Sequence, residues 1–254
     1  TCALPISREV CVAVVLSNGD ILVMGGGEID DACLFNDVWR SSDACLFNDV
    51  WRSSDAGATW TCVTPSAEWC KRSEHAAVVL ANGDILVMGG YDDDSNRLND
   101  VWRSSDAGAT WICVTRAAGW STRFGHAAVV LANGDILVMG GRDGSDDLND
   151  VWRSSDAGAT WICVTKTAPW SGRFGHAAVV LANGDILVMG GRGSSWSDDL
   201  NDVWRSSDAG ATWTCVTKTA PWSGRVCRAA AVLPNGDILI MGGEDCGGTR
   251  ANDA

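Results

Sequence analysis

The sequence predicts an all-β fold, and three observations lead to this prediction. The first is a repeat: Ile-Leu-Val-Met-Gly-Gly or a near copy begins at residues 21, 85, 136, 186 and 238. The second is that most repeats hold four short apolar runs, and the third is that turn-forming residues separate these runs. A period of about 50 residues with four strands per unit is typical of a β-propeller, whose blades bury their faces against one another. We therefore expect five blades of four antiparallel strands each.

Residues 173–222 show the expected strands of one blade in order. The apolar runs His176–Leu181 and Ile186–Met189 flank Ala-Asn-Gly-Asp, which predicts a hairpin with a type I′ turn because Asn-Gly accepts two positive φ angles. Their unbroken hydrophobicity indicates strands that are covered on both faces. Asp202–Ser206 and Thr212–Thr217 supply the third and fourth strands.

The repeats predict one domain with blades at about 8–65, 72–116, 123–166, 173–218 and 225–254. Residues 1–5 match a fourth strand, so we expect them to join the last blade, close the ring and remove its open edge. Asn252 and Asp253 fall where other repeats begin strand three, so we expect either that the last blade is short or that the natural chain continues beyond Ala254. A verbatim duplication, Asp31–Ser42 followed by Asp43–Ser54, lengthens the first repeat. Its second copy adjoins the next turn and is therefore expected to be strand three.

Several motifs of the repeat resemble those of a known family. The Gly-Gly doublet, the Leu-Asn-Asp-Val-Trp strand, a later Trp and the Arg-Phe-Gly-His segment are similar to kelch repeats over nearly the whole chain. Ser-Ser-Asp-Ala-Gly-Ala-Thr-Trp resembles the Asp-box of sialidase-like propellers, at Ser53–Trp60, Ser104–Trp111, Ser154–Trp161 and Ser206–Trp213. The resemblance implies a turn element away from the ligand site. Its Asp is expected to accept backbone N–H bonds rather than to catalyse or bind metal.

Charge and hydropathy exclude two classes of partner. The formal net charge is −13, whereas proteins that bind nucleic acid present basic surfaces to the phosphates. Cationic or neutral partners are more natural. No apolar run reaches the roughly 18 residues of a membrane span, so we expect no nucleic acid and no membrane span.

The chain has 11 cysteines, which their positions sort into two sets. One set shares a repeat position and is expected to be buried as small apolar thiols: Cys2, Cys62, Cys113, Cys163 and Cys215. Cysteines outside the repeat pattern are candidates for disulfides. Cys11 could pair with Cys227 across a closed ring, and Cys33 with Cys45. Disulfides would favour a secreted or organelle-lumenal location.

An arginine recurs at the start of each expected blade and is preceded by a tryptophan in four of the five repeats, and these residues form our candidate binding site. We call them the blade-start arginines and the blade-start tryptophans: Arg8, Arg72, Arg123, Arg173 and Arg225, and Trp69, Trp120, Trp170 and Trp222. The kelch resemblance implies that arginines here line the central mouth and grip acidic peptides. Guanidinium groups with aromatic neighbours can also bind carboxylates or planar ligands. The alternative is that each Arg binds backbone carbonyls of the next blade and each Trp fills a gap between blades.

Two further sets could hold metal ions. His75, His126 and His176 follow three of these arginines and could bind zinc, although a histidine bonded to a neighbouring strand is the alternative that we favour. The loops Asp92–Asn96, Asp143–Asp147 and Asp198–Asp199 are acidic and could collect calcium. Their spacing matches no calcium loop, so we favour a solvated acidic rim and expect no cofactor.

These observations favour a non-catalytic propeller that binds a protein or an acidic ligand on the face that carries the loops after Gly-Gly, as a scaffold or subunit of a larger assembly. Near-identical blades repeat the same residues, whereas catalysis needs different residues in different roles. A lectin with tryptophans stacked on sugar rings is one alternative. A sialidase-like glycosidase is another and would need Tyr91, the only tyrosine, as nucleophile.

Overall fold

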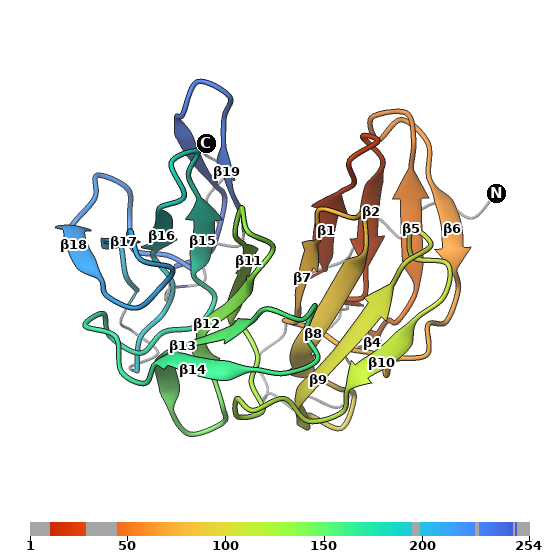
Figure 1. The fold of residues 1–254 in the computed structure, drawn as a ribbon, viewed down its shortest axis with the longest axis horizontal. Coiled ribbons are helices and arrows are strands. Elements are labelled where there is room, and N and C mark those ends of the chain that lie inside the picture. The colour runs from red at the N-terminus through yellow and green to blue at the C-terminus, as the bar shows by residue number, and fades with distance from the viewer. Residues whose placement is uncertain (1–10, 29–44, 195–198, 227–228, 246, 248–254) are drawn as a thin grey trace. The chain divides into compact units, whose positions relative to one another are not determined.

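The computed structural model describes residues 11–28, 45–194, 199–226, 229–245 and 247. The chain divides into two compact units, Thr1–Ala117 and Ala118–Ala254. Every regular element among the described residues is a β-strand (Figure 1). Within those residues, no helix has the length and apolarity needed to cross a membrane.

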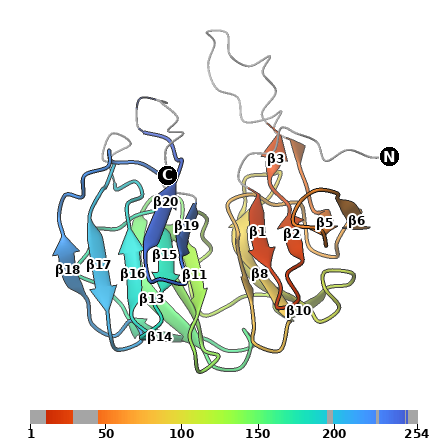
Figure 2. The same ribbon diagram turned by 90° about the horizontal axis from the view of Figure 1, so that it is seen from above.

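The first unit contains two four-stranded antiparallel sheets, which correspond to the first two expected blades. Figure 2 shows the strands of blade 1 side by side in sheet order: β1 (Val12–Val15), β2 (Ile21–Met24), β5 (Val50–Ser53) and β6 (Thr61–Thr64). Blade 2 consists of β7 (Ala76–Val79), β8 (Ile85–Tyr91), β9 (Arg97–Ser104) and β10 (Ile112–Thr115). A small hairpin pairs β3 (Gly27–Glu28) with β4 (Cys45–Leu46).

The second unit contains two more four-stranded sheets and one two-stranded sheet. Blade 3 consists of β11 (Ala127–Val130), β12 (Ile136–Arg142), β13 (Asp147–Ser154) and β14 (Ile162–Thr165). Blade 4 consists of β15 (Ala177–Val180), β16 (Ile186–Met189), β17 (Val203–Ser206) and β18 (Thr214–Thr217). The two-stranded sheet pairs β19 (Ala229–Val232) with β20 (Ile238–Met241).

The prediction of four-stranded antiparallel blades is confirmed for four repeats, and the fifth repeat forms a two-stranded sheet in the described part of the chain. Residues 1–5, which were expected to close a ring, lie outside the described residues, so ring closure stays a prediction. The prediction for the duplication is confirmed, since β5 of the second copy pairs with β2, Val23 facing Trp51. The first copy also lies outside the described residues.

The hairpin turns differ from the predicted type I′ geometry. Leu131 donates to the carbonyl of Asp135 at 2.8 Å, and Gly134 donates to the carbonyl of Leu131 at 2.9 Å. Gly134 has φ of 88°, whereas Asn133 is not among the residues with positive φ. The loop therefore has three residues, a type I turn followed by a glycine bulge. The Asn133 side chain stabilises it by accepting the backbone N–H of Asp135 at 3.0 Å.

The Gly-Gly doublet marks a point where two backbones approach closely. Gly140 and Gly141 have φ of 56° and 96°, a region that side chains rarely adopt. A Cβ on Gly141 would lie 2.9 Å from the carbonyl oxygen of Phe124 and 2.8 Å from His126 Cβ. The doublet thus lets the segment that starts each blade pass directly over strand two.

The apolar cores lie between neighbouring sheets. In the first unit, Leu22 and Val50 of blade 1 share a buried cluster with Ile85 and Val87 of blade 2. In the second unit, the equivalent residues of blades 3 and 4 form a matching cluster: Leu137, Val151, Ile186 and Val188. Strand two of blades 2, 3 and 4 is buried on both faces, as its unbroken hydrophobicity predicted, whereas in β2 of blade 1 Leu22 and Met24 are buried and Ile21 and Val23 are half-buried.

The repeat cysteines are more exposed than predicted. Cys62 and Cys113 are half-buried, while Cys163 and Cys215 are exposed. The reason is that they lie on strand four, the outermost strand of each blade, which has a neighbouring strand on one side only. Partial burial nevertheless raises the pKa of the Cys113 and Cys163 thiols. Cys2 lies outside the described residues.

Candidate functional site

The blade-start arginines of the complete repeats lie inside their own blades. Arg123, just before β11, is 0% exposed. Its Nη1 donates to Asp150 Oδ1 at 2.7 Å and to the carbonyl of Gly140 at 2.9 Å. Its Nη2 donates to Asp150 Oδ2 at 2.9 Å and Ser121 Oγ at 3.1 Å, and its Nε donates to the Ser121 carbonyl at 3.1 Å. A guanidinium has five N–H donors, so these bonds use all of them.

The same ion pair occurs in the neighbouring repeats. Arg72 binds both carboxylate oxygens of Asp100 at 2.8 Å, and Arg173 binds those of Asp202 at 2.6 and 2.8 Å. Burial by itself would raise the pKa of Asp202, but hydrogen bonds and charge from Arg173 outweigh it and hold this pKa below its usual range. The Asp202 carboxylate therefore stays ionised inside blade 4 near neutral pH.

The aspartates of these pairs are residues that the sequence analysis did not identify as partners of the arginines. Asp150 also accepts the indole N–H of Trp152 at 2.7 Å, so one carboxylate joins the blade start to strand three. The preceding Asn149 donates to the carbonyls of Ala168 and Trp170 at 2.9 and 3.0 Å. A signal for these contacts was present in the sequence, because the Asn-Asp pair recurs at a constant place in the repeats.

The blade-start tryptophans are also buried. Trp69, Trp120 and Trp170 are each 1% exposed, and Trp222 is half-buried. The ring of Trp170 lies 5.9 Å from that of Trp213 at an interplanar angle of 85°, and Arg173 Cζ lies 5.6 Å from the Trp170 centroid. Each of the three buried rings thus fills the space between the arginine that follows it and a tryptophan of the blade that it precedes.

This arrangement favours the structural alternative for the candidate site. Burial and complete internal hydrogen bonding leave Arg123 no donor for a ligand, and the covered faces of Trp120 leave no surface for stacking. The guanidinium bonds carbonyls and a carboxylate of its own blade rather than of the next one. Contact of the blade-start residues with a partner stays a prediction.

The remaining predicted residues divide between described and undescribed parts of the chain. Arg225 is 4% exposed and donates to the carbonyl of Gly242 at 3.0 Å. Arg8, Cys33 and Cys227 lie outside the described residues, as does the side chain of Cys45, so the proposed disulfides stay predictions.

The histidines pack against the blade-start tryptophans. The ring of His126 lies 5.8 Å from that of Trp120, and His176 lies 6.2 Å from Trp170. Neither nitrogen of His126 or His176 has a hydrogen-bond partner among the described residues, in contrast to the bonded histidine that we expected. Burial first, and the nearby arginine second, lower the pKa of both histidines to about 3. They are therefore neutral near pH 7.

The Asp-box-like turns have the structure that the turn interpretation predicted. In the turn Ser154–Trp161, Asp156 Oδ1 accepts the Thr160 N–H at 2.8 Å and the Ser154 hydroxyl at 2.8 Å. Asp156 Oδ2 accepts the Thr160 hydroxyl at 2.6 Å, and Gly158 has φ of 89°. These bonds, those of the Thr160 side chain most of all, lower the pKa of Asp156. The carboxylate is thus committed to the turn.

The acidic loops bind their own backbone. Asp92 accepts the N–H of Asp94 at 3.0 Å and that of Asn96 at 2.8 Å, which closes the loop between β8 and β9. Asp143 accepts the N–H of Asp146 at 3.2 Å in the next blade. Within the described ranges, no three His, Cys, Asp or Glu residues gather in a way that could hold a metal ion.

Comparison with known proteins places this architecture in a family. The model of the KLHDC2/KLHL20/DRC7 kelch-repeats domain matches residues 13–243. A solved structure described as "Structure of YjhT" is 16% identical, covers 99% of this chain and 82% of its own, and has a TM-score of 0.77, which shows a shared fold. None of the curated proteins compared with the chain matches it. The chain therefore belongs to the kelch-repeat family of β-propeller proteins.

Proposed function

We propose that this protein is a non-catalytic kelch module that binds another protein through the loops between strands two and three, as a scaffold or subunit of an assembly. The observation that carries the proposal is that the recurrent charged groups make their hydrogen bonds within their own blade or turn. Arg123 uses all its hydrogen-bond donors within its own blade, and the Asp156 carboxylate accepts hydrogen bonds within its turn. Catalytic groups need access to a substrate and distinct roles, which these repeated, satisfied groups do not offer.

The loops between strands two and three supply the variation that recognition requires. The residues after Gly-Gly read Tyr-Asp-Asp-Asp-Ser-Asn-Arg in blade 2 and Arg-Asp-Gly-Ser-Asp-Asp in blade 3, while the flanking strands are nearly identical. Asp93, Asp94 and Asp146 are exposed there. Loops that differ on a constant scaffold are typical binding elements. With a net charge of −13, the protein favours a partner with a basic surface over the acidic ligand that the arginines suggested.

The test compares two variants of equal charge. One replaces Asp92, Asp93 and Asp94 by Asn in the loop, and its control replaces Asp20, Asp135 and Asp237 by Asn in three hairpin turns at the other end of the strands. Proteins cross-linked to each variant in extracts of the source cells are quantified by mass spectrometry. We expect the loop variant to lose at least one partner that the wild type and the control retain. Equal recovery of all partners by both variants would contradict binding through this loop.

Neither alternative function gains support from the buried residues. Sugar stacking needs exposed rings, but Trp69, Trp120 and Trp170 are 1% exposed. A sialidase-type site needs arginines free to bind a carboxylate, but Arg72 and Arg173 each bind an aspartate of their own blade. Hydrolysis of an aryl sialoside by the wild type, lost in Tyr91→Phe, would contradict the non-catalytic proposal.

A further inference from the structure

The segment that starts blade 4 holds the base of the loop between β12 and β13 in blade 3. Gly141, the second glycine of the doublet, donates its N–H to the carbonyl of Arg173 at 2.8 Å, and Arg173 donates its own N–H to the carbonyl of Leu148 at 3.0 Å. The loop, with its exposed Asp146, lies between these two anchors. The loop of one blade is therefore fixed by a segment of the following repeat.

Two buried imidazoles lie against the glycine doublet at this base. A Cβ on Gly140 would lie 2.9 Å from His176 Cε1, and a Cβ on Gly141 would lie 2.8 Å from His126 Cβ. His126 belongs to the start of blade 3 and His176 to the start of blade 4, and each is 6% exposed. A change in the charge of either ring therefore acts directly on the base of the loop.

The surroundings of the two rings suit only neutral imidazoles. A protonated ring has two N–H donors, but neither nitrogen of His126 or His176 has a hydrogen-bond partner among the described residues. Burial, then Arg173 and His126, lower the pKa of His176 to about 3. Burial and Arg123 lower the pKa of His126 to about 3 against the opposing effect of Asp150. Protonation of both rings would also make them repel each other.

The carboxylates around the rings are already paired with arginines: Asp150 with Arg123, Asp202 with Arg173, and Asp147 with Arg142. The last pair lies at the base of the same loop, with a nearest N–O distance of 3.5 Å. Burial and two neighbouring aspartates raise the pKa of Asp147 in spite of Arg142. Asp147 therefore also takes up a proton on acidification, and its effect must be separated from that of the histidines.

The first unit has the same arrangement between blades 1 and 2. A Cβ on Gly25 would lie 2.8 Å from His75 Cε1, and Gly26 donates to the carbonyl of Arg72 at 3.1 Å. An imidazole at the base of the preceding loop is therefore a recurrent feature of this chain.

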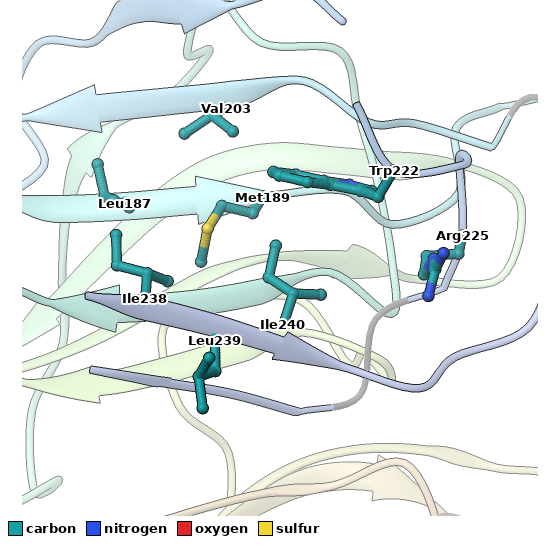
Figure 3. Close-up of a pocket in the computed structure, with 8 residues that line it drawn as sticks. All are labelled: Leu187, Met189, Val203, Trp222, Arg225, Ile238, Leu239 and Ile240. Atoms are coloured by element: carbon teal, nitrogen blue, oxygen red, sulfur yellow. The ribbon is translucent and has the colours of Figure 1, made fainter. Parts of the chain in front are cut away.

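The contact of blade 4 with the two-stranded sheet shows that the backbone bond does not need a histidine. Gly191 donates to the carbonyl of Arg225 at 3.0 Å, although the sequence has Arg228 at the position of the histidine. Figure 3 shows Arg225 at the edge of the apolar side chains, such as Trp222 and Ile240, that lie at this contact. The imidazoles between the complete blades therefore call for another explanation than support of the backbone.

We propose that His126 and His176 form an acid-sensitive latch, whose protonation releases the start of blade 4 from the base of the β12–β13 loop. The loop is held at neutral pH and loosened in acid. The release is a property of the protein alone. Its regulatory consequence, dissociation of a partner on acidification, rests on the function proposed above for these loops.

The size of the effect follows from proton linkage. Each ring has a pKa of about 3 while the latch is closed, whereas a released ring has the ordinary value of 6.5. The released form therefore binds more protons below pH 6.5, and the closed form loses stability as the pH falls. Between pH 7.5 and 4.5 each ring favours release by about 100-fold, and the two together by up to about 10,000-fold.

Hydrogen–deuterium exchange of the full chain, followed by mass spectrometry and corrected for the intrinsic pH dependence of exchange, measures the release. Peptides that contain the amides of Gly141 and Arg173 should lose more than about 100-fold in protection between pH 7.5 and 4.5. The β11–β12 hairpin should keep its protection, which distinguishes local release from unfolding. Unchanged protection of Gly141 and Arg173, or equal loss in the hairpin, would overturn the proposal.

Variants assign the effect to the rings. His126→Leu and His176→Leu should each reduce the acid-induced loss of protection to about 100-fold, and the double variant should abolish it. His75→Leu, the matched change in the first unit, and Asp147→Asn should leave the loss in the second unit as it is in the wild type. A full acid response in the double variant, or its disappearance in Asp147→Asn, would contradict the latch.

The wild type provides a test that does not depend on the folding of variants. The chain has three histidines, so carbon-13 NMR of labelled histidine gives three Cε1 resonances. The resonances of His126 and His176 should keep the neutral form well below pH 6.5 and change together with the loss of amide protection. Titration of both near pH 6.5 with the amides still protected would refute the latch.

The latch and the proposed function of the loops fail in different ways. Loss of a partner by the Asp92, Asp93 and Asp94 variant at neutral pH, without acid-induced exchange at Gly141, would show that only the latch is wrong. Acid-induced exchange in a protein whose loop variant keeps every partner would support the latch and contradict only the function proposed for the loop.

Discussion

The buried ion pair of Arg123 and Asp150 tests how much such a pair stabilises its own blade. Asp150→Ala removes the two carboxylate oxygens that accept from Arg123, at 2.7 and 2.9 Å, and the acceptor of the Trp152 indole at 2.7 Å. Arg123 is 0% exposed, so water cannot replace the lost carboxylate without opening the blade. The variant therefore leaves a buried positive charge without a counter-ion.

Loss of one partner of a buried ion pair costs about 3–5 kcal/mol of stability, most of it from the uncompensated charge. A urea titration followed by tryptophan fluorescence should detect this cost, because it lowers the midpoint by roughly 1–3 M at ordinary m-values. The partly exposed pair of Arg153 and Asp135, whose nearest N–O distance is 3.8 Å, provides the control. Asp135→Asn should cost only about 0–1 kcal/mol.

A double variant separates the charge from the contacts. Arg123→Met with Asp150→Leu removes both charges and fills the space with apolar groups, so it should be more stable than Asp150→Ala by at least about 1 kcal/mol. The reasoning would be refuted if Asp150→Ala cost no more than the surface control, or if the double variant were the less stable of the two.

Three further predictions concern a histidine, a glycine and a turn. The pKa of His176 is about 3 in the folded chain and near 6.5 when unfolded, so the unfolded state binds more protons below pH 6.5. The free energy of unfolding should therefore fall as the pH drops from 6.5 toward 3. His176→Leu should flatten this part of a pH series of urea midpoints. Gly141→Ala should lower stability by more than about 2 kcal/mol, because Gly141 has φ of 96° and an added Cβ would lie within 3 Å of other atoms. Gly134→Ala, whose Cβ would meet nothing within 4 Å, should cost about 1 kcal/mol. Similar losses for both variants in thermal unfolding would argue against backbone crowding. Asp156→Ala removes three acceptor contacts in its turn and should cost about 1–2 kcal/mol, with Asp156→Asn closer to the wild type in the same assay; no loss in either would show that the turn does not need the carboxylate.

The repeats in the sequence were sufficient to predict the strands, their order within each blade and the turn role of residues such as Asp156. Periodicity did not reveal the direction of the recurrent side chains. Arg123 recurs equally well whether it faces a ligand or a buried aspartate, and only the distance to Asp150 decides between them. The blade-start positions were found, but their partners were not.

The turn and cysteine predictions failed for local reasons. Asn-Gly predicts a two-residue turn only when the flanking residues pair directly, whereas here Ala132 joins the loop and Asn133 keeps a negative φ. The cysteines were placed in the core because a small apolar thiol suits it, yet Cys163 lies on the outermost strand. Whether a strand lies inside or at the edge of a sheet depends on the sheet as a whole, which composition does not report.

The closure of each ion pair inside one repeat has a consequence for how such a chain can change its length. Arg72, Arg123 and Arg173 meet their aspartates 28, 27 and 29 residues further along, before the next repeat begins. Gain or loss of a whole unit therefore leaves each of these ion pairs intact. The contacts between blades, apolar surfaces and hydrogen bonds such as that from Thr165 Oγ1 to the Gly210 carbonyl at 2.7 Å, must form with new neighbours. A break that removed either member of a pair would leave the other charge buried without its partner.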